Sequence, residues 1–276
     1  MKNKKHYRVL LSGEGGQGIQ TIATSLTYAA MLSGDEVTYI PIFGVEQRGA
    51  PSVAFVTISS EKIRYPRFQE SDICVILRGR AVVAVTEYIT PNTEVVFDSS
   101  TIEAKKLPKL AVKRLGIPAT RVASEQFLPK SYNVLIFGML CKMLSIDKEN
   151  GWKAILKDLG SKFKDKTIEQ KNRDAFDFGY EAVFEKGKYS KPTMSTKESD
   201  NIYKNAEKTA IVKPSLCKGC GICIEKCPVG ALSFGEDLGV FGFPVPKIDL
   251  AKCINCGNCR RFCPDGAIAV EKNQSK

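Results

Sequence analysis

The sequence has no uninterrupted apolar stretch long enough to span a lipid bilayer. We also expect no secretory signal peptide, because the basic start MKNKKHYRVLL contains only a short apolar run that ends at glycines. A disulfide scaffold is not expected from the 10 cysteines: eight recur at a regular spacing, and Cys74 and Cys141 lie in apolar runs typical of buried thiols. Free thiols belong in a reducing compartment. We therefore expect a soluble, cytoplasmic protein.

Nucleic-acid recognition motifs are missing as well. The chain is basic, with 41 lysine and arginine residues, 30 acidic residues and a formal net charge of +11. A basic surface can bind nucleic acid, but neither a recognised binding motif nor an interleaved pattern of aromatic and basic residues accompanies it. The charge therefore favours an acidic protein partner, and we expect no nucleic acid and no membrane as partner.

A cysteine spacing that occurs twice near the C-terminus is the most specific pattern. The blocks CKGCGICIEKCP and CINCGNCRRFCP each place cysteines at i, i+3, i+6 and i+10, with proline after the last. This run is typical of bacterial two-cluster ferredoxins, in which the fourth cysteine of a block binds the other cluster. The predicted ligands are Cys217, Cys220, Cys223 and Cys263 for cluster 1, and Cys253, Cys256, Cys259 and Cys227 for cluster 2.

Zinc is the alternative occupant, since C-x2-C pairs also form structural zinc sites. A zinc site uses four ligands and needs neither the third cysteine of a block nor the Cys-Pro pair. Gly219, Gly221 and Gly257 suit loops whose N–H groups turn toward sulfur. We therefore expect two [4Fe–4S] clusters and a role in electron transfer.

Basic residues stand next to the predicted ligands at Lys218, Lys226, Arg260 and Arg261. Positive charge there should stabilise a reduced, more negative cluster. The alternative is that these are surface charges with little effect, since exposed charges couple weakly.

The sequence before the cysteine blocks alternates β-rich runs with helical periodicity. Residues 7–12, 19–34 and 37–40 form a strand–helix–strand opening, which predicts a mostly parallel sheet. Further expected strands are residues 53–59, 73–77, 95–98 and 121–123, and further expected helices are residues 105–115, 132–144, 152–159 and 167–184. The expected fold class is α/β: an N-terminal, mostly parallel open sheet with helices (Rossmann-like), plus a C-terminal α+β bacterial 2[4Fe–4S] ferredoxin domain.

A change of composition divides the chain. Residues 186–208 are polar, rich in lysine and poor in aliphatic side chains, which is typical of a linker. The expected domains are residues 1–185, an α/β docking and accessory domain, and residues 209–276, the ferredoxin domain. Residues 234–253, between the cysteine blocks, are expected to form a hairpin or a loop.

A glycine-rich loop follows the first expected strand. Gly13, Gly15 and Gly18 satisfy G-x-G-x-x-G between a strand and a helix, the context of a dinucleotide site. An NAD site also needs an acidic residue at the end of the second strand, but that strand ends in the apolar sequence IPI. The loop can still hold another anion at the helix N-terminus, or its glycines can serve only a tight turn.

A second polar turn, EQRG, occupies residues 46–49 between two expected strands. Ligands and partners bind at the carboxyl edge of open α/β sheets, where this turn should lie. Arg48 can hold a carboxylate or phosphate there. It can equally form a structural ion pair with Glu46 or belong to an interface.

Two of these stretches together carry a family resemblance. SGEGGQGIQT (residues 12–21) combined with YIPIFGVEQRGAPSVAFVTIS (residues 39–59) resembles the gamma subunit of 2-oxoacid:ferredoxin oxidoreductases, the pyruvate, 2-oxoglutarate and branched-chain 2-oxoacid enzymes. The C-terminal module is similar to their delta subunit, a two-cluster ferredoxin. The resemblance covers about residues 7–184 and 209–271 and implies a fused gamma–delta subunit of a pyruvate-type enzyme.

In that family, thiamine diphosphate and Mg on alpha and beta catalytic subunits act on the 2-oxoacid, and coenzyme A takes the acyl group. The resemblance implies that this chain docks on those subunits and passes electrons through its clusters to an external ferredoxin. It further implies a dimer of heterotrimers, with Gly15, Gly16, Gln17, Gly18 and Arg48 at coenzyme A or at a partner interface. The chain has no G-D-G sequence and its single histidine, His6, lies near the N-terminus, so we expect no catalytic residue and no catalysis by the chain alone.

Two other classes of function stay open. One is a stand-alone ferredoxin-type electron carrier with a dimerisation domain. The other is a nucleotide-binding iron–sulfur reductase whose N-terminal domain binds flavin or nicotinamide. Co-purification with subunits that carry thiamine diphosphate would favour the complex, and a flavin or nicotinamide spectrum would favour the reductase.

Overall fold

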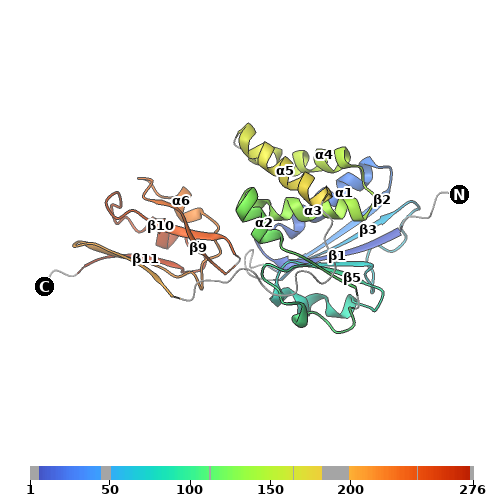
Figure 1. Cartoon of the computed structure of the whole chain (residues 1–276), viewed down its shortest axis with the longest axis horizontal. Coiled ribbons are helices and arrows are strands. Elements are labelled where there is room, and N and C mark those ends of the chain that lie inside the picture. The colour runs from blue at the N-terminus through green and yellow to red at the C-terminus, as the bar shows by residue number, and fades with distance from the viewer. Residues whose placement is uncertain are drawn as a thin grey trace. The chain divides into compact units, whose positions relative to one another are not determined.

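The computed structural model describes residues 6–44, 51–111, 113–163, 165–181, 199–240 and 242–273. The chain divides into two compact units, Met1–Thr193 (unit 1) and Met194–Lys276 (unit 2), which are seen in Figure 1. Across the described ranges, every helix is either too short or too polar to cross a lipid bilayer.

Unit 1 is built on a six-stranded sheet with the strand order β2-β3-β1-β4-β5-β6. Its strands are β1 (His6–Glu14), β2 (Glu36–Phe43), β3 (Pro51–Ser59), β4 (Ile73–Ile76), β5 (Glu94–Asp98) and β6 (Lys113–Ile117). β1, β4, β5 and β6 pair in parallel, whereas β3 pairs antiparallel with both β1 and β2. Only β3 of these six strands therefore runs in the opposite direction, and the expected mostly parallel sheet is confirmed.

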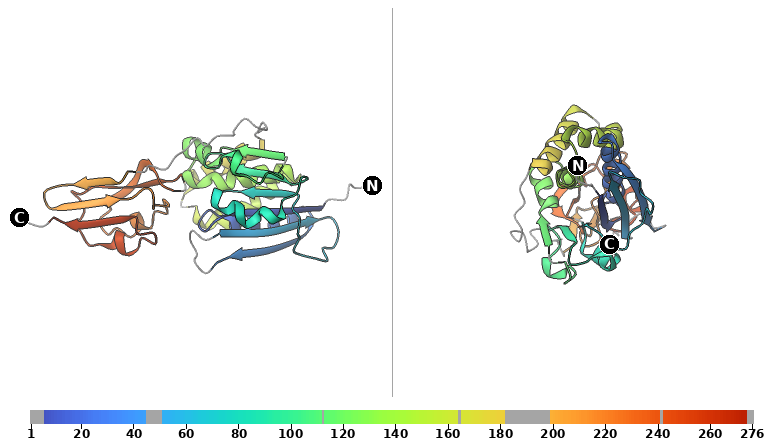
Figure 2. Two further views of the ribbon diagram at one scale, coloured as in Figure 1. Left: turned by 90° about the horizontal axis from the view of Figure 1, so that it is seen from below. Right: turned by 90° about the vertical axis from the view of Figure 1, so that its right-hand side faces the viewer.

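Helices cover one face of this sheet. They are α1 (Ile19–Leu32), α2 (Ala119–Gln126), α3 (Tyr132–Met143), α4 (Lys148–Leu159) and α5 (Lys166–Glu181), with the short 3-10 turns η3 (Pro129–Ser131) and η4 (Gly160–Lys162) between them. The 3-10 segment η1 (Gly79–Tyr88) lies on the opposite face, in front of the sheet in the left view of Figure 2. A further 3-10 turn, η2 (Ala104–Lys106), follows β5.

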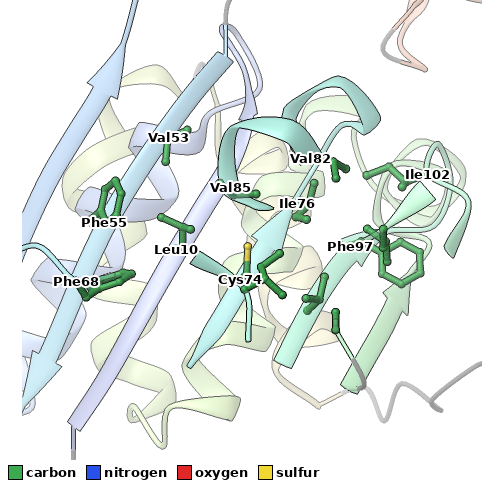
Figure 3. Close-up of a cluster of buried hydrophobic side chains, with 14 residues drawn as sticks. Leu10, Val53, Phe55, Phe68, Cys74, Ile76, Val82, Val85, Phe97 and Ile102 are labelled. Carbon is green, nitrogen blue, oxygen red and sulfur yellow. The ribbon is translucent and has the colours of Figure 1, made fainter. Parts of the chain in front are cut away.

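The alternation of side chains along the strands gives each face its own core. Leu10, Phe55, Ile76 and Phe97 point to the face covered by η1, where they pack with Val82 and Val85 of that segment (Figure 3). Val9 and Leu11, the neighbours of Leu10, are fully buried on the other face, because successive strand residues point to opposite sides. The sheet is thus buried on both faces, as in other mostly parallel sheets.

Two expected elements are wrong. Residues 105–115 were expected to form one helix, but they contain the end of η2 and the start of β6, and Pro108 between them has no N–H to continue a helix. Residues 121–123 were expected to form a strand, but they lie within α2. Both runs are short, so their pairing with the rest of the fold decides their conformation.

The described part of unit 2 contains two small sheets and two one-turn helices. β7 (Asn201–Lys204), β8 (Lys208–Val212) and β11 (Ile268–Lys272) form one sheet, and β9 (Leu232–Leu238) and β10 (Pro244–Ile248) form the expected hairpin. The helices are α6 (Ile222–Glu225) and α7 (Asn258–Arg261). This is the expected small α+β domain. β7 occupies residues that were expected to belong to the 186–208 linker, and residues 182–198 lie outside the described ranges.

Candidate functional site

The two cysteine blocks fold into two copies of the same loop. In each copy a left-handed glycine, Gly221 or Gly257, begins a one-turn helix that carries the third cysteine. The residue just before the second cysteine of each block also has a left-handed backbone conformation. It is Gly219 in the first block and Asn255, with φ 58°, in the second. Asparagine tolerates this conformation better than most residues, so the sequence repeat is also a repeat of backbone geometry.

Each loop helps to line a hollow that contains four cysteines. The first hollow is lined by Cys217, Cys220, Cys223 and Cys263, and the second by Cys227, Cys253, Cys256 and Cys259. These are the two sets predicted from the spacing, so the fourth cysteine of each block does reach the hollow of the other block. Within the described ranges, no three histidine, cysteine, aspartate or glutamate side chains converge closely enough to hold a single metal ion. The thiols surround a space instead, which fits a cubane held by four thiolates.

Backbone amides donate to four of these sulfur atoms. The N–H groups of Gly219 and Asn255 point at Cys217 and Cys253, each with an N···Sγ distance of 3.4 Å. The N–H groups of Ala231 and Ala267 point at Cys227 and Cys263, at 3.2 and 3.3 Å. Such N–H···S bonds are among the features that adjust the potential of an iron–sulfur cluster.

Three of the cysteine thiols that line the hollows are buried. Burial raises the pKa of Cys217 to about 11 and that of Cys223 to about 12, and it also raises the pKa of Cys259. These sulfur atoms therefore resist ionisation by themselves. A cationic cluster core, when bound, would supply the positive charge that a buried thiolate needs.

Charged side chains next to the two hollows differ. Lys218, which was predicted to lie beside a ligand, forms an ion pair with Asp265 at 2.7 Å, and both residues line the first hollow. Lys208, which the sequence analysis did not single out, donates from Nζ to the carbonyl oxygen of Cys253 at 2.5 Å. Lys226 contacts Glu225 at 3.6 Å, and Arg260 lies 3.9 Å from Glu271, both in exposed pairs.

The glycine loop in unit 1 connects β1 to α1 at the carboxyl edge of the sheet. Gly16 and Gly18 have φ values of 96° and 77°, and Gly18 is the N-terminal cap of α1. Gly16 is exposed, and a Cβ there would meet no atom within 4 Å. The accessible part of the loop is therefore centred on Gly15 and Gly16.

Gln17 has its side chain inside this loop. Its Oε1 accepts from the N–H of Glu14 at 2.8 Å, and its backbone carbonyl accepts from the hydroxyl of Tyr132 at 2.6 Å. The Gln17 side chain is thus engaged by its own loop, and the Gln17 backbone carbonyl links this loop to α3.

A group of buried charges lies beside this loop and was not predicted from the sequence. Glu14 ends β1 and its Oε1 contacts Nε of Arg80 at 3.3 Å, while its Oε2 is buried without a hydrogen-bond partner. Burial lowers the pKa of Arg78, although the negative charges of Glu14 and Asp98 act to raise this pKa. Burial also raises the pKa of Asp98, which accepts hydrogen bonds from Thr120 and from the N–H of Ser100. The only signal in the sequence was that each charge lies at or just after the end of a strand.

Arg48, the other predicted binding residue, lies outside the described residues, as does the rest of the EQRG turn.

Family models match both parts of the chain. Residues 8–182 match the family described as pyruvate ferredoxin/flavodoxin oxidoreductase, and residues 216–267 match the 4Fe-4S dicluster domain. The two models therefore cover the six-stranded sheet with its helices and the loops that carry the eight cysteines.

Known proteins resemble about two thirds of the chain. The 2-oxoglutarate synthase subunit KorC of Methanocaldococcus jannaschii is 35% identical over 185 residues, which are 66% of this chain and 96% of that protein. The pyruvate/ketoisovalerate oxidoreductases common subunit gamma of Thermococcus litoralis is 33% identical over 171 residues, which are 60% of this chain and 92% of that subunit.

Among solved structures, the 2-oxoglutarate:ferredoxin oxidoreductase from Magnetococcus marinus, with 2-oxoglutarate, coenzyme A and succinyl-CoA bound, is similar in fold. Its TM-score is 0.58 at 24% identity, and the match covers 72% of this chain and 35% of that one. The chain therefore belongs to the pyruvate ferredoxin/flavodoxin oxidoreductase family, and it joins the domain of that family to a 4Fe-4S dicluster domain.

Proposed function

We propose that the chain is the fused gamma and ferredoxin subunit of a thiamine-diphosphate-dependent 2-oxoacid:ferredoxin oxidoreductase. The observation that carries this proposal is the union, in one chain, of the family domain with a unit in which two hollows each have four cysteines. The clusters, when bound, supply one-electron transfer. The cysteine loops hold them and donate N–H groups to the sulfur atoms, and unit 1 docks on the alpha and beta catalytic subunits.

The substrate is proposed only as a 2-oxoacid. Pyruvate is the first expectation from the resemblance, but one similar subunit belongs to a 2-oxoglutarate enzyme and another to pyruvate and ketoisovalerate enzymes. Substrate choice on this proposal rests with the catalytic subunits, which hold thiamine diphosphate and Mg. The electron acceptor is an external ferredoxin, the compartment is the cytoplasm, and the complex is a dimer of heterotrimers.

The test is co-purification followed by assay. The tagged chain should isolate larger subunits that carry thiamine diphosphate, and the complex should reduce ferredoxin when a 2-oxoacid and coenzyme A are added. The chain alone should contain about eight iron atoms and give the EPR signal of two interacting [4Fe–4S] clusters after reduction. A chain that purifies alone with bound flavin or nicotinamide, or with zinc in place of iron, would contradict the proposal.

We propose further that the glycine loop contacts coenzyme A. The N-terminus of α1 favours an anion through its free N–H groups and the helix dipole. Gly16 in the preceding loop is exposed, and Gly15 and Gly18 are half-buried. Gln17 acts in this proposal by holding the loop, since its side chain is already engaged. The similar enzyme from Magnetococcus marinus is described with coenzyme A bound. Arg48 is retained as a further contact to coenzyme A or to a partner.

A charge placed on the loop tests this contact. Gly16→Asp should raise the KM for coenzyme A on the order of tenfold, which corresponds to about 1.4 kcal/mol of repulsion, while the KM for the 2-oxoacid stays unchanged. Gly34→Asp is the matched control, because Gly34 also has a positive φ and open space around it but follows the other end of α1. Equal effects of the two variants on coenzyme A would show that the loop has no special role.

A further inference from the structure

The two hollows of unit 2 differ at equivalent positions of the internal repeat. After the first cysteine, the first block has Lys218 and the second block has Ile254; after the Cys-Pro pair, the first block has Val229 and the second has Asp265. Because the fourth cysteine crosses over, Lys218 and Asp265 both line the first hollow, whereas Ile254 and Val229 both line the second. The first hollow thus has an ion pair where the second has two apolar side chains.

A cation on another element contacts the backbone of Cys253, one of the cysteines that line the second hollow. Lys208 on β8 is only 16% exposed, and its Nζ donates to the carbonyl oxygen of Cys253 at 2.5 Å. Glu207 is the carboxylate beside it, but that contact measures 3.9 Å and the Glu207 side chain is 79% exposed. An exposed pair at this distance is screened by water. The charge of Lys208 is therefore far less neutralised than that of Lys218, which contacts Asp265 at 2.7 Å with both side chains mostly buried.

This difference has a consequence for electron affinity. Reduction adds one negative charge to a cluster, so a nearby uncompensated cation stabilises the reduced form and raises the reduction potential. A close ion pair such as that of Lys218 and Asp265 carries little net charge. A carboxylate alone would lower the reduction potential of a nearby cluster. The burial of Lys208 strengthens its effect, because buried charges are less screened than exposed ones.

We propose that Lys208 makes the site of Cys227, Cys253, Cys256 and Cys259 the higher-potential of the two cluster sites. The first electron that enters unit 2 then resides at this site. On the proposed function, on which this step depends, the same site is the one that delivers electrons to the acceptor. Its exposed cysteine, Cys256, and the adjacent Ile254, which is 60% exposed, leave this site accessible from the surface of unit 2.

The test is an anaerobic redox titration of the full-length, cluster-loaded chain, followed by EPR. Lys208→Gln keeps a donor for the Cys253 carbonyl but removes the charge, so it should shift the higher of the two midpoint potentials downward and leave the lower one in place. Asp265→Asn removes the carboxylate charge that Lys218 contacts, so it should shift the lower potential upward and leave the higher one in place. Both variants should narrow the gap between the two potentials.

Two controls complete this experiment. Lys208→Arg retains the charge and should keep the potentials of the unaltered chain, and Lys204→Gln removes an exposed lysine of β7 and should change neither potential. The proposal is overturned if Lys208→Gln shifts the lower potential or neither one, or if the unaltered chain shows two indistinguishable potentials. Because the potentials are measured on the chain alone, their outcome does not depend on partner subunits, and failure to isolate such subunits would leave this result intact.

Discussion

At the scale of single residues, the fourth cysteine of each block has the most informative position. Cys227 belongs to the first block but lines the hollow of the second, and Cys263 does the reverse. Each accepts an N–H from the alanine four residues later, which holds the sulfur in place after the Cys-Pro turn. The two blocks are thus linked through their ligands, and neither can form a complete site alone.

This crossing predicts which cysteine substitutions act on the same cluster. Cys227→Ala and Cys253→Ala should both disturb cluster 2, so the double variant should keep about half of the iron and show one cluster without magnetic coupling. Combining Cys227→Ala with Cys217→Ala should disturb both clusters and remove most of the iron. Iron analysis and EPR check this, and the opposite pattern in the two double variants would mean that each block binds its own cluster.

Residue-level prediction from the sequence worked where the signal was local. The cysteine ligand sets depend on spacing within a block and on a known pattern of crossing, and the structure brings the predicted sets together. Lys208 could not be found in this way, because it is 45 residues from Cys253 and reaches it only through the placement of β8. The buried charges of Glu14, Arg78 and Asp98 interact for a similar reason: Glu14 and Asp98 end β1 and β5, Arg78 lies two residues after β4, and these three strands become neighbours only in the sheet.

At the scale of elements, helices α3 and α5 pack against each other through two glycines. A Cβ at Gly179 would overlap the backbone carbonyl oxygen of Leu135, and a Cβ at Gly138 would overlap that of Phe176. Backbone atoms cannot move aside as a flexible side chain can, so the two helices would have to separate. Phe176, which is fully buried between Phe137 and Trp152, depends on this close approach.

Gly179→Ala should therefore destabilise unit 1 by about 1–3 kcal/mol, the usual cost of overpacking a core. A lower midpoint of urea unfolding, followed by the fluorescence of Trp152, would measure it. Gly160→Ala is the control, since a Cβ there meets Leu156 at an ordinary 3.9 Å and the stability should change by less than about 0.5 kcal/mol. If the two variants unfold at the same urea concentration, the helices do not require glycine at their crossing.

Helices and strands were predicted correctly where the apolar pattern extends over many residues, and wrongly where the pattern is short. The strand–loop–helix opening and helix α3 follow the predicted ranges closely, because each has a continuous apolar pattern. β6 and α2 were assigned to the wrong type, since runs of five and eight residues carry too little periodicity to decide. The position of β3 between β1 and β2 could not be predicted from the sequence either, because strand order depends on pairing between distant segments.

At the scale of the whole molecule, the two units have separate cores of different character. The core of unit 1 is made of aliphatic and aromatic side chains and includes Cys74, whereas the core of unit 2 includes the predicted ligands Cys217, Cys223 and Cys259. A small domain with few large apolar side chains commonly needs a metal centre for its stability. Unit 2 should therefore depend on its clusters, and unit 1 should not.

Removal of the clusters with a chelator and an oxidant, followed by reduction of the thiols, tests this difference in one chain. The eight cysteines of unit 2 should then react rapidly with a thiol reagent, because the unit loses its packing when the clusters leave. Cys74 and Cys141 should stay unreactive until urea unfolds unit 1, since burial raises the pKa of both thiols and shields them from the reagent. Rapid reaction of all ten cysteines without urea would mean that unit 1 also needs the clusters. Protection of the eight would mean that unit 2 folds without them, and its N–H···S loops would then be a preformed cage.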